Sequence, residues 1–104
     1  LARLPGWATP MPTAAYGVPN RWLTVVTLDG RDPLQAVAAL AGGGFESRPL
    51  WKPMHLQPVF RDAPAFLSGV DDALFAHGLC LPSGRGLTPE LMDEAIALLE
   101  ALPC

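Results

Sequence analysis

Three prolines, Pro49, Pro53 and Pro58, punctuate the stretch of residues 46–60 and constrain it more than any other feature of the chain. Each proline fixes its own φ, removes a backbone donor and biases the preceding residue towards extended backbone. A continuous helix or a central strand over the whole stretch is therefore excluded. The pattern predicts a short strand that continues into a stiff, extended loop.

The same loop gathers cationic and aromatic side chains, namely Arg48, Trp51, the single lysine Lys52, and His55. A stiff loop loses little backbone entropy when it closes on a ligand, and functional side chains are common on such loops. One hypothesis is that the loop binds a small anion. The alternative is a surface loop with incidental charges, in which Trp51 and Phe60 simply anchor the loop to the core.

Strands and helices alternate on either side of this loop. Strands are expected over residues 21–28, 45–50 and 79–81, because these runs are apolar and partly β-branched. Helices are expected after the capping residues Asp32 and Thr88, each followed by a proline, and over residues 71–77. The order β-α-β-loop-α-β-α predicts a small α/β layered domain with about three or four strands. Helices between short strands suggest parallel crossovers, although the long loop at residues 51–61 also allows one antiparallel neighbour.

Apolar spacing and glycines predict how the helices pack and end. The first helix should bury Leu34, Val37, Ala38 and Ala41, and the last should bury Leu91, Ala95, Leu98, Leu99 and Leu102. Glycines at 42–44 should end the first helix, and Gly78 should end the middle helix in the left-handed conformation.

Composition excludes several classes of protein. The chain has 104 residues, half of them apolar and 16% charged, which favours one folded domain over disorder. A net charge of −3 without a basic run argues against nucleic acid as a partner. No apolar stretch is long enough to cross a bilayer. Two cysteines, Cys80 and Cys104, are too few for a disulfide framework or a zinc site, so we expect no metal and a cytoplasmic location.

The polar residues outside the loop form no catalytic pattern. Asp71 and Asp72 could act as paired carboxylates, but neighbours on a helix point about 100° apart and acidic residues are favoured in a first turn. Cys80 lies within an expected strand, where a buried structural thiol is favoured, and His77 suits the end of a helix. The segment 84–86 lacks the spacing and the following lysine of a phosphate loop. We therefore predict no catalytic residue in this chain.

Three segments together resemble a known family. Residues 20–24, 46–58 and 74–84 closely resemble the C-terminal part of the DegT/DnrJ/StrS family, whose members are pyridoxal phosphate (PLP)-dependent aminotransferases acting on keto sugars of nucleotide sugars. The resemblance runs from about residue 20 to residue 102. It is closest to the branch that makes amino sugars for pilin and other protein glycosylation and for surface polysaccharides.

The resemblance implies that residues 20–104 are the small C-terminal domain of a longer chain. Residues 1–19, which begin without a methionine, would connect it to an N-terminal large domain that holds PLP and supplies the Schiff-base lysine. The full enzyme would be a homodimer that takes its amino group from a donor such as glutamate. Lys52 matches the family's loop and not that catalytic lysine, so the fragment alone should bind no cofactor and be inactive.

The resemblance also implies a candidate substrate site. Four residues would face the nucleotide-sugar cleft: Arg48, Trp51, Lys52 and His55. Arginine and lysine suit a pyrophosphate by charge and geometry. The alternative is a free-standing α/β module that binds a small anion or dimerises. A domain taken from a larger chain should expose apolar surface where its partner packed, whereas a free-standing module should not.

Overall fold

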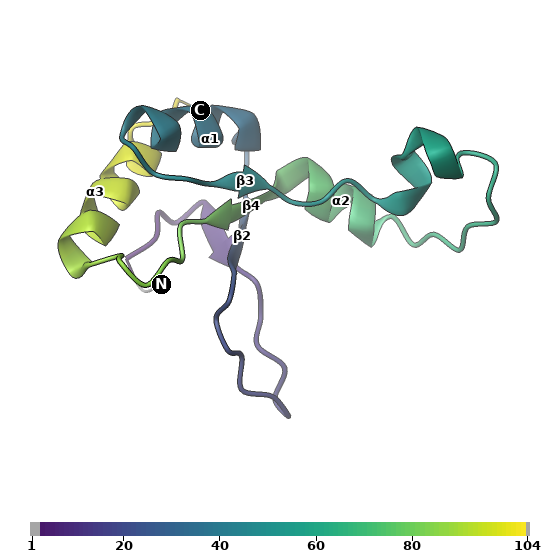
Figure 1. The fold of residues 1–104 in the computed structure, drawn as a ribbon, viewed down its shortest axis with the longest axis horizontal. Helices are drawn as coiled ribbons and strands as arrows, with labels where there is room; N and C mark the ends of the chain where they lie inside the picture. The colour runs from purple at the N-terminus through teal and green to yellow at the C-terminus, as the bar shows by residue number, and fades with distance from the viewer. Residues whose placement is uncertain (1–2, 104) are drawn as a thin grey trace.

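The computed structural model describes residues 3–103, so Cys104 lies outside the described residues. The elements are β1 (Ala8–Pro10), β2 (Thr24–Leu28), α1 (Pro33–Gly42), β3 (Arg48–Pro49), α2 (Val70–His77), β4 (Gly78–Leu81) and α3 (Pro89–Glu100), with two 3₁₀ turns, η1 (Met54–Leu56) and η2 (Pro58–Phe60). The strands form one sheet in the order β1-β2-β4-β3 (Figure 1). The predicted α/β class and strand number are confirmed.

Strands β2 and β3 both pair antiparallel with β4, so they run parallel to each other, and α1 joins them as an expected crossover helix would. Strand β4 lies between them, however, and every hydrogen-bonded pair of strands is antiparallel, so the expectation of parallel neighbours is wrong. The reason lies in the connection between α2 and β4. Helix α2 ends at His77 and β4 begins at Gly78, so α2 does not carry the chain back along the sheet as a crossover helix does. Strand β4 then runs between β2 and β3 and pairs with both.

Strand β1 was not predicted, because it lies in the proline-rich range 1–19 that was expected to be a connection. Its three residues pair with β2, with Ala8 opposite Leu28 and Pro10 opposite Val26. Pro10 is tolerated because β1 is an edge strand, where one side of the backbone needs no partner. The sheet therefore takes in residues from that range.

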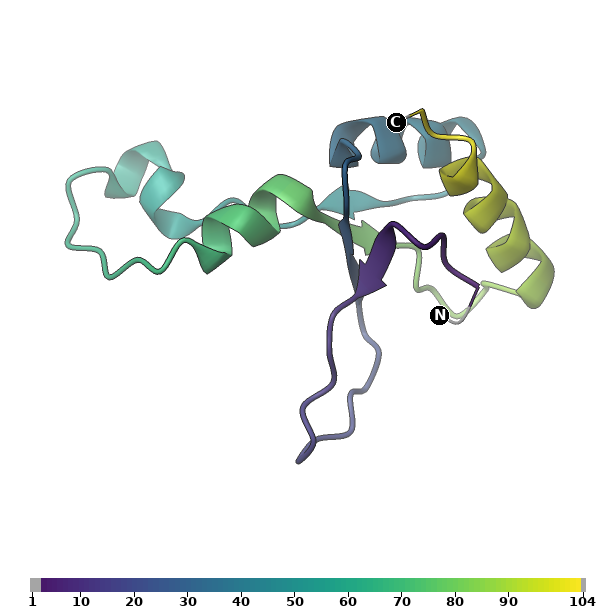
Figure 2. The ribbon, with the colours of Figure 1, turned by 180° about the vertical axis from the view of Figure 1, so that it is seen from behind.

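The core lies between the sheet and the helices α1 and α3, which pack together at one end of the molecule (Figures 1 and 2). Its buried residues come from every layer of the fold: Ala8, Val26, Leu28, Ala36, Leu40, Leu79, Ala95 and Leu99. Among the residues predicted for α3, Ala95 and Leu99 are buried and Leu98 and Leu102 are partly buried, whereas Leu91 is exposed.

Helix α1 begins and ends as predicted but buries a different face. The Asp32 carboxylate accepts a hydrogen bond from the Leu34 amide at 2.8 Å, and the cap at the other end is Gly43. The buried residues are Pro33, Ala36 and Leu40. Of the predicted set, Val37 is partly buried against the core, whereas Leu34 is 64% exposed and Ala38 and Ala41 are also exposed. Both sets have helical spacing, so periodicity alone could not choose between them.

Gly78 is required for a different reason from the predicted one. Its backbone is extended, with φ −89° and ψ 142°, so it does not form a left-handed stop. A Cβ atom at this position would lie 2.4 Å from the backbone oxygen of Leu74 and 2.1 Å from Cδ1 of Leu50. Glycine is needed here because α2, β4 and the Leu50 side chain approach too closely for any side chain.

Two excursions project from this core: residues 11–23 between β1 and β2, and residues 50–69 between β3 and α2 (Figure 1). They raise the radius of gyration to 15.1 Å, against about 13 Å for a compact domain of this length. Most of the exposed large apolar side chains lie on them, including Tyr16, Trp22, Trp51 and Phe66. Among residues 3–103, no helix is long and apolar enough to span a membrane.

Candidate functional site

The candidate loop leaves the sheet at Leu50, whose amide donates to the Gly78 carbonyl at 3.3 Å. It is less extended than predicted, because η1 follows Pro53 and η2 begins at Pro58. Proline has a φ that suits the first position of a helical turn, where its missing N–H is not needed. Pro58 therefore starts a short turn, whereas Pro53 keeps an extended backbone, with φ −53° and ψ 146°, and directly precedes one.

Arg48 lies in β3 opposite Cys80 and is paired with a near neighbour. Its guanidinium donates to the Glu46 carboxylate from Nη2 at 2.6 Å and from Nε at 3.1 Å. Both side chains are more than three-quarters exposed. Pairs of this kind contribute at most about 1 kcal/mol, so Arg48 can exchange Glu46 for an anionic ligand at low cost.

Trp51 and Lys52 point away from the core. Trp51 is 69% exposed and Phe60 is 36% exposed, so the hypothesis that they anchor the loop in the core is wrong for this chain. Lys52 is exposed, and its ammonium makes no ion pair with any residue in the range 3–103. An exposed aromatic ring beside an unpaired cation is suited to a ligand that carries both a flat or apolar face and a negative charge.

His55 is held in a different way from the other three candidates. Its side chain is only 16% exposed, and it lies between two carboxylates of the first turn of α2. The Nε2 atom lies 2.8 Å from Oδ1 of Asp72, and Nδ1 lies 3.4 Å from Oδ2 of Asp71. Asp71 and Asp72 do occupy a helical first turn, as predicted. Their contact with His55 was missed, because they lie sixteen and seventeen positions further along the chain and no sequence pattern signals the pairing.

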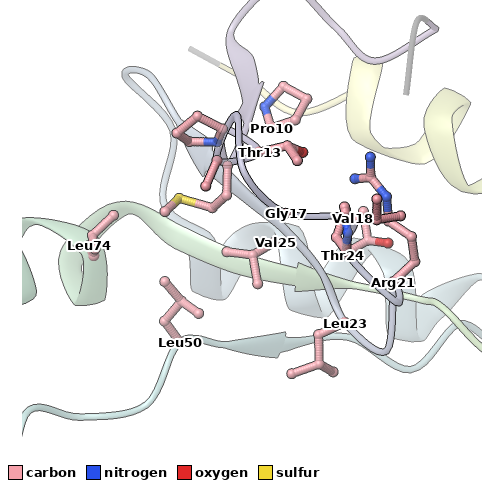
Figure 3. A pocket seen from close by; sticks show the side chains of 14 residues that line it. Pro10, Thr13, Gly17, Val18, Arg21, Leu23, Thr24, Val25, Leu50 and Leu74 are labelled. Atoms are coloured by element: carbon pink, nitrogen blue, oxygen red, sulfur yellow. The ribbon is translucent and has the colours of Figure 1, made fainter.

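A cavity of about 550 Å³ lies between the excursion of residues 11–23 and the side chains of Leu50 and Leu74 (Figure 3). Its walls are mostly apolar, and among residues 3–103 Arg21 is the one charged residue that lines it. Arg21 has a φ of 55°, a left-handed conformation that non-glycine residues rarely adopt. The sequence analysis did not identify this cavity, because its walls come from segments far apart in the chain.

Cys80 fits the predicted role of a structural thiol. It lies in β4 and is 7% exposed. Burial raises the pKa of the Cys80 thiol, because the thiolate would lose its hydration. A thiol that stays neutral in this way is a poor nucleophile, so Cys80 is not a catalytic candidate.

The residues of this chain do not fit a PLP site. The cofactor needs a lysine for its aldehyde, an acid beside its pyridinium nitrogen and a set of donors for its phosphate. The single lysine, Lys52, is exposed on a loop, Glu46 is paired with Arg48, and Asp71 and Asp72 are both engaged with His55. No chemical step that requires PLP can therefore be assigned to residues of this chain.

Comparison with known proteins identifies relatives of this chain. No protein-family model matches it. It is 46% identical over 95 residues to EpsN of Bacillus subtilis, a protein named as a pyridoxal phosphate-dependent aminotransferase, and the match covers 86% of this chain and 24% of EpsN. It is 34% identical to the GDP-perosamine synthase of Caulobacter vibrioides, over 96% of this chain and 28% of the synthase.

Solved structures share its fold. A DegT/DnrJ/EryC1/StrS aminotransferase from Brucella abortus superposes with a TM-score of 0.77 at 21% identity, and the aminotransferase TlmJ from Streptoalloteichus hindustanus with 0.77 at 19%. The two superpositions cover 95% and 97% of this chain, respectively, and 27% of the length of each aminotransferase. The fold is therefore that of the C-terminal part of an aminotransferase. The relatives and structural neighbours of this chain are sugar aminotransferases of the DegT/DnrJ/StrS type, and the chain matches about a quarter of their length.

Proposed function

We propose that this chain is the C-terminal small domain of a PLP-dependent aminotransferase that aminates a keto nucleotide sugar. The observation that carries the proposal is the 46% identity to EpsN over most of the chain. Residues 20–104 form the small domain, and residues 1–19 connect it to a large domain while adding β1 to the sheet. The large domain supplies the PLP site that these residues lack, and two subunits form the enzyme.

The exposed surface of the domain supports a larger assembly. The excursions of residues 11–23 and 50–69 carry most of the exposed large apolar side chains. Exposed apolar surface of this extent is typical of a face that packs against another domain or subunit. We propose that the product serves pilin or protein glycosylation or the synthesis of surface polysaccharide.

We propose Arg48, Trp51 and Lys52 as contacts for the nucleotide sugar. Arg48 and Lys52 would bind the pyrophosphate, since both are exposed cations and the partner of Arg48 is a weakly held surface carboxylate. Trp51 would pack its exposed ring against the nucleoside or the sugar.

The proposal is tested by comparing two proteins with keto sugars of nucleotide sugars and glutamate as the amino donor. We expect the full reading frame that contains this chain to transfer the amino group. The chain of residues 1–104 alone should show no turnover and no saturable incorporation of PLP after borohydride reduction. Trapping of PLP on Lys52 in the short chain would contradict the assignment of the cofactor to another domain. The absence of turnover by the full protein would contradict the proposed activity and favour an anion-binding or dimerisation module.

A further inference from the structure

The segment of residues 51–68 is held to the rest of the domain by few contacts. None of its residues is buried. Its backbone hydrogen bonds are all local, such as those from Leu56 to Pro53 and from Phe60 to Gln57. Gln57 bonds within the segment as well, to the carbonyl of Lys52 at 3.1 Å. Among residues 3–103, the contacts of His55 are the only polar ties between this segment and the remaining domain.

These contacts occupy both polar atoms of the imidazole. Nε2 faces Asp72 and Nδ1 faces Asp71, and an ionised carboxylate can only accept hydrogen bonds. Nε2–H donates to the Asp72 carboxylate, and Nδ1 faces the Asp71 carboxylate at 3.4 Å without a hydrogen bond. A phosphate group would find no free donor on His55. It would also be repelled by the two carboxylates beside it.

We propose that His55, Asp71 and Asp72 form a clip that positions the candidate contacts Trp51 and Lys52, and that His55 acts through this clip without touching the ligand. Lys52 lies three positions before His55, and the side-chain amide of Gln57 bonds back to the Lys52 carbonyl. Fixing η1 on α2 therefore fixes the path of the chain at Trp51 and Lys52. The identity of the ligand rests on the proposed function, but the clip does not.

Hydrogen exchange of the full-length protein, followed on peptides that cover residues 51–68, tests the clip directly. We expect His55→Gln and the double variant D71N/D72N each to raise exchange of the amides of residues 54–63 about tenfold, since each removes or weakens the hydrogen bond to Asp72 and the contact with Asp71. The triple variant should exchange no faster than His55→Gln, because all three changes remove the same contacts. His77→Gln, the same substitution at the other histidine, should have no effect. Equal exchange in His55→Gln and His77→Gln would overturn the proposal.

The direction of the change in KM distinguishes the clip from a purely electrostatic effect of Asp71 and Asp72. Asp71 and Asp72 carry negative charge near a loop that would bind an anion, so neutralising them should lower KM if charge alone matters. The clip predicts the opposite: D71N/D72N and His55→Gln should both raise the KM for the nucleotide sugar several-fold, with a smaller change in kcat. A raised KM in His55→Gln beside a lowered or unchanged KM in D71N/D72N would show that His55 touches the ligand. If the wild-type protein aminates no sugar, the proposed function fails, and the exchange measurement still decides the clip.

Discussion

Replacing Gly78 by alanine is expected to destabilise the fold by about 3 kcal/mol. The added Cβ would lie 2.4 Å from the backbone oxygen of Leu74 and 2.1 Å from Cδ1 of Leu50. The leucine side chain can move, but the carbonyl belongs to α2 and cannot move without shifting the helix from β4. Urea denaturation of the 104-residue chain measures the effect.

Gly84→Ala is the matched control for this change. Nothing lies within 4 Å of the Cβ position at Gly84, so the same substitution should change the free energy of unfolding by less than about 0.5 kcal/mol. If the two variants unfold at the same urea concentration, the close approach of α2 and β4 at Gly78 is not a determinant of the fold.

A second large effect is expected from Leu40→Ala in α1. Leu40 is fully buried in the core, and removing its side chain should cost about 2–5 kcal/mol through lost burial and the cavity that remains. Leu34→Ala, six residues earlier in the same helix, should cost less than about 0.5 kcal/mol because Leu34 is 64% exposed. Thermal or urea unfolding of both variants compares the two faces directly.

The comparison also tests which face of α1 is buried in the assembled protein. In the full-length protein, a large effect of Leu34→Ala would mean that another domain or subunit covers that face. In the 104-residue chain, a larger effect for Leu34 than for Leu40 would contradict the packing of α1 against α3.

Local features of this fold were predictable because each depends on a few neighbouring residues. The Asp32 and Thr88 caps, the glycines after α1 and the β-branched run of β2 are signals of this kind. The choice of buried face in α1 was not predictable, because two sets of residues have the same spacing and only contact with α3, β3 and β4 selects one. The sheet order and the antiparallel pairing depend on contacts between distant segments and were equally out of reach.

In the candidate site too, features that depend on neighbouring residues were predictable, and contacts between distant segments were not. The positions of Arg48 in a short strand and of Trp51 and Lys52 on the exposed loop after it followed from the three prolines and the clustered charges. The role of His55 did not, since its partners Asp71 and Asp72 lie sixteen and seventeen residues away and are explained equally well by the helix dipole. The cavity beside Arg21 was missed because its apolar walls meet only in the folded chain.

The visible spectrum of the full-length protein tests the central claim most directly. The reading frame that contains this chain is expressed with PLP, and absorbance is recorded before and after borohydride and after glutamate. We expect a band of PLP bound to a lysine outside residues 1–104, lost on borohydride reduction and shifted by glutamate as the amino group is transferred. Absence of this band, or a band that glutamate does not change, would contradict the assignment of this chain to an aminotransferase.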